Sequence, residues 1–292
     1  MPFVKKILEY KSVSFVGMEK NAGKTQTLNY VLSRLRSFND VHLAISSIGI
    51  DGETVDQVTH TAKPEITISK GTKFVTAQAL YSQKQIVSQI EALSRSTTAL
   101  GRLITARAMS EGKVLLAGPS GTKQLKDFID TLLCDCSLCL IDGALSRMSF
   151  GSPCVTDAMI LSTGAAVSAS LGVMVDKTKF IYELTMLPKY QGSEIERLKQ
   201  KDNGIFALSK GEIIDMEIPS LLMIDRYKDK IFSFGRTLFV SGVLNDKFMK
   251  FVCSQKDIEN TEIIIKDFTK NFASAESVRR FLQRGGRLSV LY

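Results

Sequence analysis

Short runs of apolar residues alternate along this chain with stretches in which apolar residues recur every three or four positions. Residues 13–16 form the first such run, and after it Leu28, Leu32 and Leu35 follow at i, i+4 and i+7. A short uninterrupted run is typical of a strand buried on both faces, whereas the second spacing is that of a helix with one buried face. The pattern therefore predicts a strand over residues 13–16 and a helix over residues 25–36.

The same patterns predict further buried strands, the last of them an edge strand, over residues 42–47, 138–141, 158–161, 238–243, 262–265 and 288–291. Helices are expected over residues 82–98 and 123–133, and after each of the strands at 238–243 and 262–265. Turn-forming glycines separate short strand-like segments and indicate two hairpins, which are residues 65–69 with 73–76 and residues 103–106 with 114–117.

A Gly-Lys-Thr turn lies between the first strand and the first helix, in the segment V-S-F-V-G-M-E-K-N-A-G-K-T of residues 13–25. This is the context of a phosphate-binding loop, or P-loop. Gly23 would let the main chain approach an anion, Lys24 would reach the β- and γ-phosphates, and the Thr25 hydroxyl would hold Mg²⁺. The residues expected to contact the nucleotide are Lys20, Asn21, Ala22, Gly23, Lys24, Thr25 and Gln26. Lys20 fits a solvated side chain equally well.

The match to the usual P-loop pattern G-x-x-x-x-G-K-[ST] has one flaw. Met18 occupies the position of the first glycine, and Gly17 lies one residue too early. The loop is then either one residue longer than usual or turned differently. The alternative is a strand-to-helix turn in which Gly-Lys-Thr is incidental.

Acidic residues follow two of the other predicted strands. Asp142 ends the segment L-C-L-I-D, as the second acidic motif of P-loop NTPases does; like Lys24 it is a candidate catalytic residue, and it would help to hold Mg²⁺, directly or through water. Its alternative role is to cap the next turn. Asp51 and Glu53 follow the strand at 42–47, where they could position water or metal, although Asp51-Gly52 is also an ordinary turn pair. The carboxyl ends of parallel strands meet at one edge, so these residues are expected near one site.

Buried strands that alternate with helices are typical of a mostly parallel sheet covered on both faces. Together with the motif, this predicts an α/β fold: a three-layer, P-loop NTPase-like, mostly parallel sheet with β-hairpin insertions. Residues 1–180 would form the nucleotide-binding core. Residues 181–236, with strand-like pieces near Ile213 and Leu221, would be an insertion or subdomain, and residues 237–292 would complete the same sheet.

Composition narrows the choice of partners. The 292 residues carry a formal net charge of +8, which favours polyanions, and nucleotides satisfy this as well as nucleic acid does. The C-terminal arginines alternate with apolar residues at helical spacing, so they are expected on the solvent-exposed face of a helix. Binding of nucleic acid by these arginines is therefore not favoured. The guanine-recognising N/T-K-x-D pattern is missing, which favours ATP over GTP.

The chain shows neither a signal peptide nor a membrane span, and a soluble, cytoplasmic protein is expected. Its five cysteines, an odd number, do not indicate a disulfide framework. Cys134, Cys136 and Cys139 form a cluster without a second cysteine pair, and Cys139 is expected to be buried as a small apolar residue rather than to bind metal.

Beyond the loop, several motifs resemble one family: the P-loop subunit of the reactivase that serves adenosylcobalamin-dependent lysine 5,6-aminomutase and D-ornithine 4,5-aminomutase. The motifs are V-G-M-E-K-N-A-G-K-T, S-I-G-I-D-G-E from residue 47, K-P-E-I from residue 63, L-A-G-P-S from residue 116, L-I-D-G-A-L-S-R from residue 140 and V-T-D-A-M-I-L-S-T-G-A from residue 155. They cover about the first 180 residues.

The resemblance implies an ATP-binding and ATP-hydrolysing subunit that works with a MutS-like ATPase subunit and helps an aminomutase to exchange inactivated cobalamin. Cobalamin would belong to the client enzyme, because the base-off motif D-x-H-x-x-G is broken by Ile45 after Asp40 and His42. Two alternatives remain open. One is a P-loop NTPase of cofactor biosynthesis or a metabolic kinase or ligase, and the other is a nucleic-acid-binding or regulatory protein with a vestigial nucleotide site.

Overall fold

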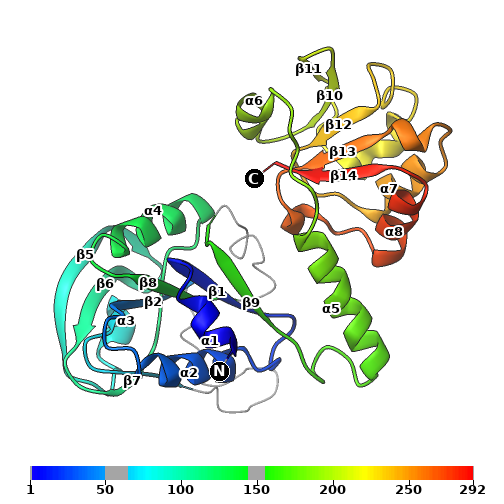
Figure 1. The fold of residues 1–292 in the computed structure, drawn as a ribbon. Helices are drawn as coiled ribbons and strands as arrows, with labels where there is room; N and C mark the ends of the chain where they lie inside the picture. Colours follow the sequence, from blue (N-terminus) through cyan, green and yellow to red (C-terminus); the bar gives the residue numbers. More distant parts are fainter. Residues whose placement is uncertain (1, 50–64, 144–154, 292) are drawn as a thin grey trace. The chain divides into compact units, whose positions relative to one another are not determined.

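The computed structural model describes residues 2–49, 65–143 and 155–291. The chain divides into two compact units, residues 1–174 and 175–292. Figure 1 shows the helices and strands of each unit. Among the described residues, no helix combines the length and the apolar character that crossing a membrane requires.

The elements of the first unit are α1 Pro2–Ile7, β1 Ser12–Gly17, α2 Lys24–Leu35, β2 Leu43–Ser47, β3 Ile66–Ile68, β4 Lys73–Ala77, α3 Gln78–Tyr81, β5 Ser88–Thr98, β6 Gly101–Ala108, β7 Gly112–Val114, α4 Thr122–Leu132, β8 Leu138–Asp142 and β9 Ala158–Ser162. Within the described ranges, seven strands form one sheet in the order β5-β6-β4-β2-β8-β1-β9. β4, β2, β8, β1 and β9 run parallel, and β6 is antiparallel to both of its neighbours. β3 and β7 pair with each other in a separate two-stranded sheet.

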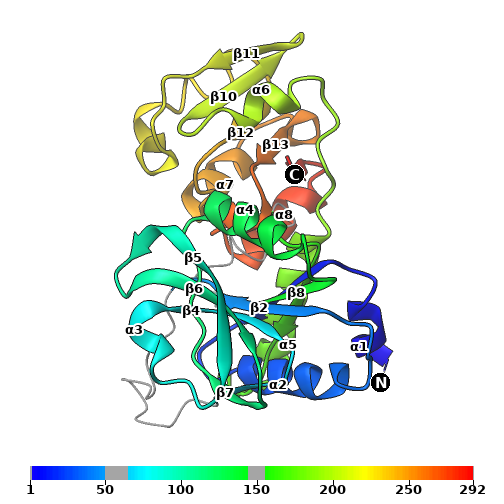
Figure 2. The same ribbon diagram turned by 90° about the vertical axis from the view of Figure 1, so that its left-hand side faces the viewer.

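Helices cover both faces of the large sheet, as Figure 2 shows for α2 and α4. Leu28 and Val31 of α2 pack in one buried cluster with Phe15 of β1. Leu125 of α4 packs in another with Ile141 of β8. Successive side chains of a strand point to opposite faces, and both faces are covered, which explains why β1 and β8 are buried along their whole length. The predicted α/β class with a mostly parallel sheet is confirmed.

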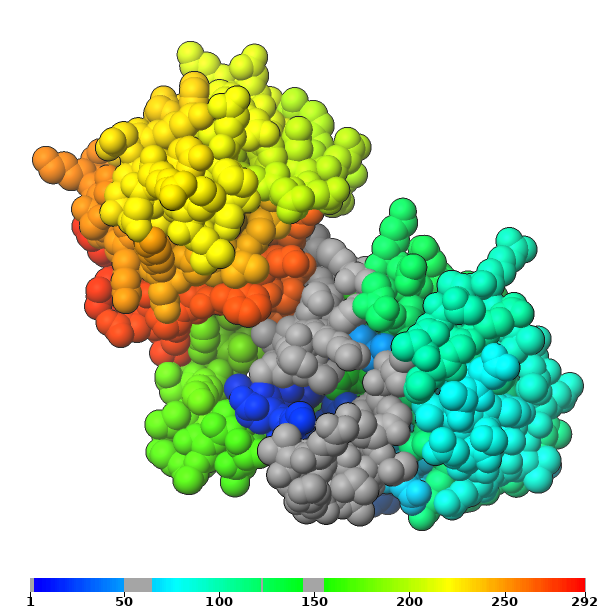
Figure 3. Space-filling model, turned by 180° about the vertical axis from the view of Figure 1, so that it is seen from behind, coloured from blue at the N-terminus to red at the C-terminus, as the bar shows by residue number. Residues whose placement is uncertain are grey.

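Three local predictions in the first unit are wrong. Residues 82–98 do not form a helix, because residues 88–98 form β5, which pairs with β6. The hairpin expected between residues 65–69 and 73–76 is absent, since β3 pairs with β7 and β4 pairs with β2 and β6. The second expected hairpin is absent for the same reason. β5 is mostly exposed at the sheet edge, and Figure 3 shows the surface around it in cyan to blue-green.

α5 Leu171–Thr185 leads from the first unit into the second. The elements that follow are α6 Ile195–Lys199, β10 Ile205–Ser209, β11 Glu212–Asp215, the 3₁₀ helix Leu221–Arg226, β12 Thr237–Val240, α7 Asp246–Cys253, the 3₁₀ helix Ile258–Asn260, β13 Glu262–Ile265, the 3₁₀ helix Phe268–Lys270, α8 Ala275–Gln283 and β14 Arg287–Val290. The expected helix after each of the strands β12 and β13 is present, and the strand-like piece near Leu221 is helical instead.

The second unit has its own five-stranded sheet, in the order β11-β10-β12-β13-β14 among the strands that the structure describes. β12, β13 and β14 are parallel, and β10 is antiparallel to β12. Residues 237–292 therefore do not complete the first sheet, contrary to the sequence-based expectation. The reason is that the β10–β11 hairpin supplies the neighbour of β12, and α7 and α8 bury a separate core around Phe248 and Phe281.

Candidate functional site

Four parallel strands of the first sheet end at the same edge. Their last residues are Gly17 of β1, Ser47 of β2, Asp142 of β8 and Ser162 of β9. The chain runs from β1 to β2 on one side and later crosses from β8 to β9 on the other side of β1. In open α/β sheets, ligands bind beyond the carboxyl ends at such a change of direction. The segment after β1 therefore lies where a fold of this kind binds its ligand.

The loop after β1 closes back over Gly17. A Cβ atom at Gly17 would lie 3.3 Å from the carbonyl oxygen of Glu19 and 3.4 Å from Cβ of Lys24, which leaves little room for a side chain. Met18 is buried, and its N–H donates to the carbonyl of Ser162 at 2.9 Å. The loop thus holds one more residue between its glycines than the usual pattern, and Gly17 lies beneath it.

Two residues of this loop have left-handed backbone conformations, Asn21 with φ 61° and Gly23 with φ 87°. Gly23 is also the N-cap of α2 and provides no side-chain cap. The amides of Lys24, Thr25 and Gln26 open the helix, where N–H groups have no acceptor within the helix. The turn therefore combines a glycine in the left-handed conformation, backbone amides without a capping side chain and the positive end of a helix dipole. This combination favours the binding of an anion.

Lys24 and Asp142 meet at this edge, although 118 positions separate them in the sequence. Lys24 Nζ lies 2.8 Å from Asp142 Oδ1, and the two side chains are only 17% and 4% exposed. β8 places Asp142 beside Phe15 of β1, and Gly143 N–H donates to the Phe15 carbonyl at 2.9 Å. An ammonium and a carboxylate are thus held together, largely out of water, beside the uncapped amides of α2.

The remaining predicted site residues differ in their placement. Lys20, Asn21 and Gln26 are exposed on the loop and first helical turn, and Thr25 is half-buried. Ala22 is buried, so its side chain packs under the loop rather than facing a ligand. The predicted positions Asp51 and Glu53 lie outside the described residues. Within the described ranges, no three Cys, His, Asp or Glu side chains are grouped so that they could hold a metal ion by themselves.

Sequence reasoning missed the contribution of residues 116–119, which were expected partly in a hairpin strand. Gly118 N–H donates to the Gly49 carbonyl at 2.9 Å, and Gly49 N–H donates to the Pro119 carbonyl at 3.1 Å. A Cβ atom at Gly118 would lie 1.8 Å from the Ser47 carbonyl oxygen. Only glycine permits this approach, and it brings a second loop to the carboxyl edge beside β2. The Gly-Pro pair was the sequence signal for a loop here.

Charged groups at the amino end of the sheet serve the fold. Asp157 accepts hydrogen bonds from Ser12 N–H at 2.9 Å and from the Ser12 hydroxyl at 3.1 Å, where β1 and β9 begin. Lys73 at the start of β4 is paired with Asp135 and, at 3.0 Å, with Glu91. Burial alone would lower the pKa of Lys73, but these hydrogen bonds outweigh it and raise the pKa.

Cys139 lies fully buried in β8, as its apolar surroundings predict, and burial raises the pKa of its thiol. A thiol kept neutral is a poor metal ligand and a poor nucleophile.

Comparison of the chain with protein-family models, with curated proteins and with solved structures found no match. The assignment of function therefore depends on the residues themselves.

Proposed function

We propose that the first unit binds a nucleoside triphosphate, with ATP favoured, at the carboxyl edge of its sheet. The observation that carries the proposal is the 2.8 Å pair of Lys24 and Asp142 beside the uncapped start of α2. A P-loop requires such a lysine next to the helix that receives the phosphates, and its second acidic residue lies at the end of a neighbouring strand.

Each residue has a definite role in this proposal. The amides from Gly23 to Gln26 would bind phosphate oxygens, and the Lys24 ammonium would turn from Asp142 to the β- and γ-phosphates. Thr25 and Asp142 would hold Mg²⁺, directly or through water. A bound Mg²⁺ would supply charge neutralisation for the phosphates. Of the earlier candidates, Lys20 and Asn21 would border the phosphates from the loop, and Asp51 and Glu53 remain proposals from the sequence alone.

The resemblance in sequence supports a more specific role. We propose that the protein is the nucleotide-binding subunit of a reactivating factor and acts, with a MutS-like ATPase subunit, on a lysine or ornithine aminomutase whose cobalamin has been inactivated. Nucleotide binding can shift the client between closed and open forms only by the difference in affinity for those forms. Binding at Lys24 and Thr25 would set that difference, and hydrolysis would reset it.

The first test is the affinity of the purified chain for a fluorescent ATP analogue with Mg²⁺. Lys24→Ala should weaken binding at least about tenfold, because hydrogen bonds to charged groups contribute about 1.5–3 kcal/mol each. Lys6→Ala, which removes an exposed lysine of α1, is the matched control and should bind like the parent chain. Equal affinity of Lys24→Ala and the parent would remove the site assignment.

A second test addresses Asp142. Asp142→Asn should retain nucleotide binding, but the affinity should depend less on Mg²⁺ when metal is titrated at fixed nucleotide, because a neutral amide is a weaker ligand for a hard cation. An unchanged metal dependence would return Asp142 to a structural role.

The reactivase role is tested with an oxygen-inactivated aminomutase, fresh adenosylcobalamin and the MutS-like subunit. Recovery of mutase activity that needs both ATP and this chain, and that Lys24→Ala abolishes, supports the role. Turnover of ATP with a small acceptor and no client protein would instead identify a metabolic kinase, a ligase or an enzyme of cofactor biosynthesis.

A further inference from the structure

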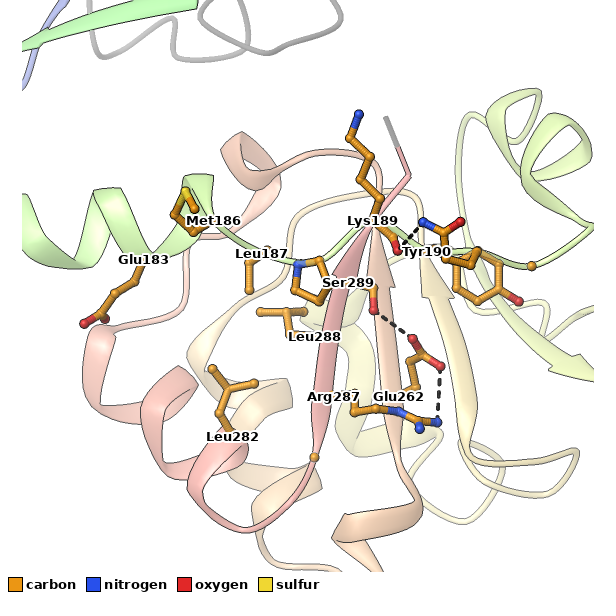
Figure 4. A pocket seen from close by; sticks show the side chains of 14 residues that line it. Glu183, Met186, Leu187, Lys189, Tyr190, Glu262, Leu282, Arg287, Leu288 and Ser289 are labelled. Atoms are coloured by element: carbon orange, nitrogen blue, oxygen red, sulfur yellow. Dashed lines mark hydrogen bonds and ion pairs between the residues drawn. The ribbon is translucent and has the colours of Figure 1, made fainter.

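The second unit contains an open groove of about 630 Å³ beside its edge strand β14 (Figure 4). One side of the groove is apolar and is formed by residues near the end of α5 and by Leu282 of α8 and Leu288 of β14. The other side is polar and contains Glu262 of β13 with Arg287 and Ser289 of β14. A groove with one apolar and one charged side suits an amphipathic ligand.

The apolar side continues outside the groove along α5. Tyr182 and Met186 are one helical turn apart and are 62% and 65% exposed, and Met186 also lines the groove. Tyr182 lies on the face of α5 away from Leu184, which is buried, and Met186 follows directly after the helix, where its N–H donates to the Tyr182 carbonyl at 3.1 Å. Aromatic and methionine side chains this exposed, continuous with a groove, are typical of a protein-binding surface rather than of an enclosed small-molecule pocket.

The charges that face outward at this surface are positive. Glu183 accepts a hydrogen bond from Arg279 Nε at 2.9 Å, so its charge is compensated within the unit. Glu262 is held by the Ser289 hydroxyl at 2.7 Å. Its contact with Arg287 is long, at 3.4 Å, and the Arg287 side chain is 66% exposed, so Arg287 is accessible to a further partner.

We propose that this surface, defined by Tyr182, Met186, Leu282 and Arg287, binds an acidic amphipathic helix of a partner protein. The apolar residues of that helix would lie along Tyr182, Met186 and Leu282. A carboxylate on its flank would accept hydrogen bonds from Arg287, whose planar donors match a carboxylate in pairs. The proposal concerns the second unit alone and does not depend on nucleotide binding at Lys24.

The test uses the full chain and two sets of stapled helical peptides as probes. Both sets carry leucines at i, i+4, i+7 and i+11, flanked by glutamates in one set and by lysines in the other. The glutamate set should bind, as measured by fluorescence anisotropy, and the lysine set should not. Arg287→Ala should weaken the affinity for the glutamate set about tenfold or more, and Arg287→Lys should weaken this affinity less. Met186→Asp should abolish binding.

Arg226→Ala is the matched control, because it removes an exposed arginine of the same unit outside the groove and should leave the affinity unchanged. Equal binding of both peptide sets, binding that Arg287→Ala does not weaken, or no binding at all would overturn the proposal. Self-association of the chain that Met186→Asp removes would also overturn it, because a second copy would then be the occupant. Nucleotide affinity, measured in parallel, should not change in any of these variants.

Discussion

Replacing Lys24 by methionine should destabilise the first unit as well as remove nucleotide binding. Lys24 Nζ and Asp142 Oδ1 are 2.8 Å apart, and Asp142 is only 4% exposed. At an effective dielectric constant of about 20, Coulomb's law gives an attraction of about 6 kcal/mol at this distance. Desolvation of both charges offsets part of it, but removing one partner of a buried pair costs about 3–5 kcal/mol. We expect a loss near the lower end, about 3 kcal/mol, because the Lys24 side chain is 17% exposed and the pair is therefore not fully buried.

The assay is hydrogen exchange followed by mass spectrometry, which reports the stability of each unit separately. Peptides from β1 and β8 should lose protection in Lys24→Met, and peptides from β12 and β13 provide the internal control. The double variant Lys24→Met/Asp142→Asn should recover more than half of the loss, because the buried carboxylate charge is then removed together with the ammonium. Unchanged protection of β8 in the single variant, or a double variant no more stable than the single one, would refute the reasoning.

Three further outcomes follow from the structure. Gly118→Ala should lower the thermal stability of the first unit, because its Cβ would lie 1.8 Å from the Ser47 carbonyl oxygen, and a melting temperature equal to that of the parent would contradict that approach. The hydrogen bond from Lys73 holds the pKa of Asp135 below its ordinary value. The ionised Asp135 carboxylate should therefore stabilise the fold above pH about 4, and this stabilisation should be lost as the pH falls through the lower folded-state pKa. Urea midpoints measured against pH should show this loss in the parent chain, and Asp135→Asn should reduce it. Phe248→Ala, in the core of the second unit, should cost about 3–5 kcal/mol, measured by exchange of β12 peptides, while nucleotide affinity stays unchanged.

Several elements could be predicted because their own sequence fixes them. The strand before the loop, the helix after it and the strand that ends in Asp142 each combine an apolar run or a helical spacing with a clear terminus. The candidate pair of Lys24 and Asp142 could be predicted as well, since carboxyl ends of parallel strands meet at one edge. The contact itself needed the strand order, which places β8 next to β1.

Other elements could not be predicted because partners distant in the sequence decide them. Ile90 and Leu93 have a spacing compatible with a helix, yet both are exposed in β5, which forms by pairing with β6. No buried face imposed a period there, so the spacing carried no information about the core. The strands β3 and β4 exist as expected, but neither pairs with the other, because local patterns do not specify which strand is the neighbour.

The sequence by itself determined the alternation of buried strands and helices and the composition of the loop from Gly17 to Thr25, because burial and turn formation act on residues that are close along the chain. Only the tertiary structure decided that residues 237–292 belong to a second sheet and that Gly118 touches the end of β2. These features depend on contacts between segments tens of residues apart, and such contacts are selected by the packing of the whole core rather than by any local period.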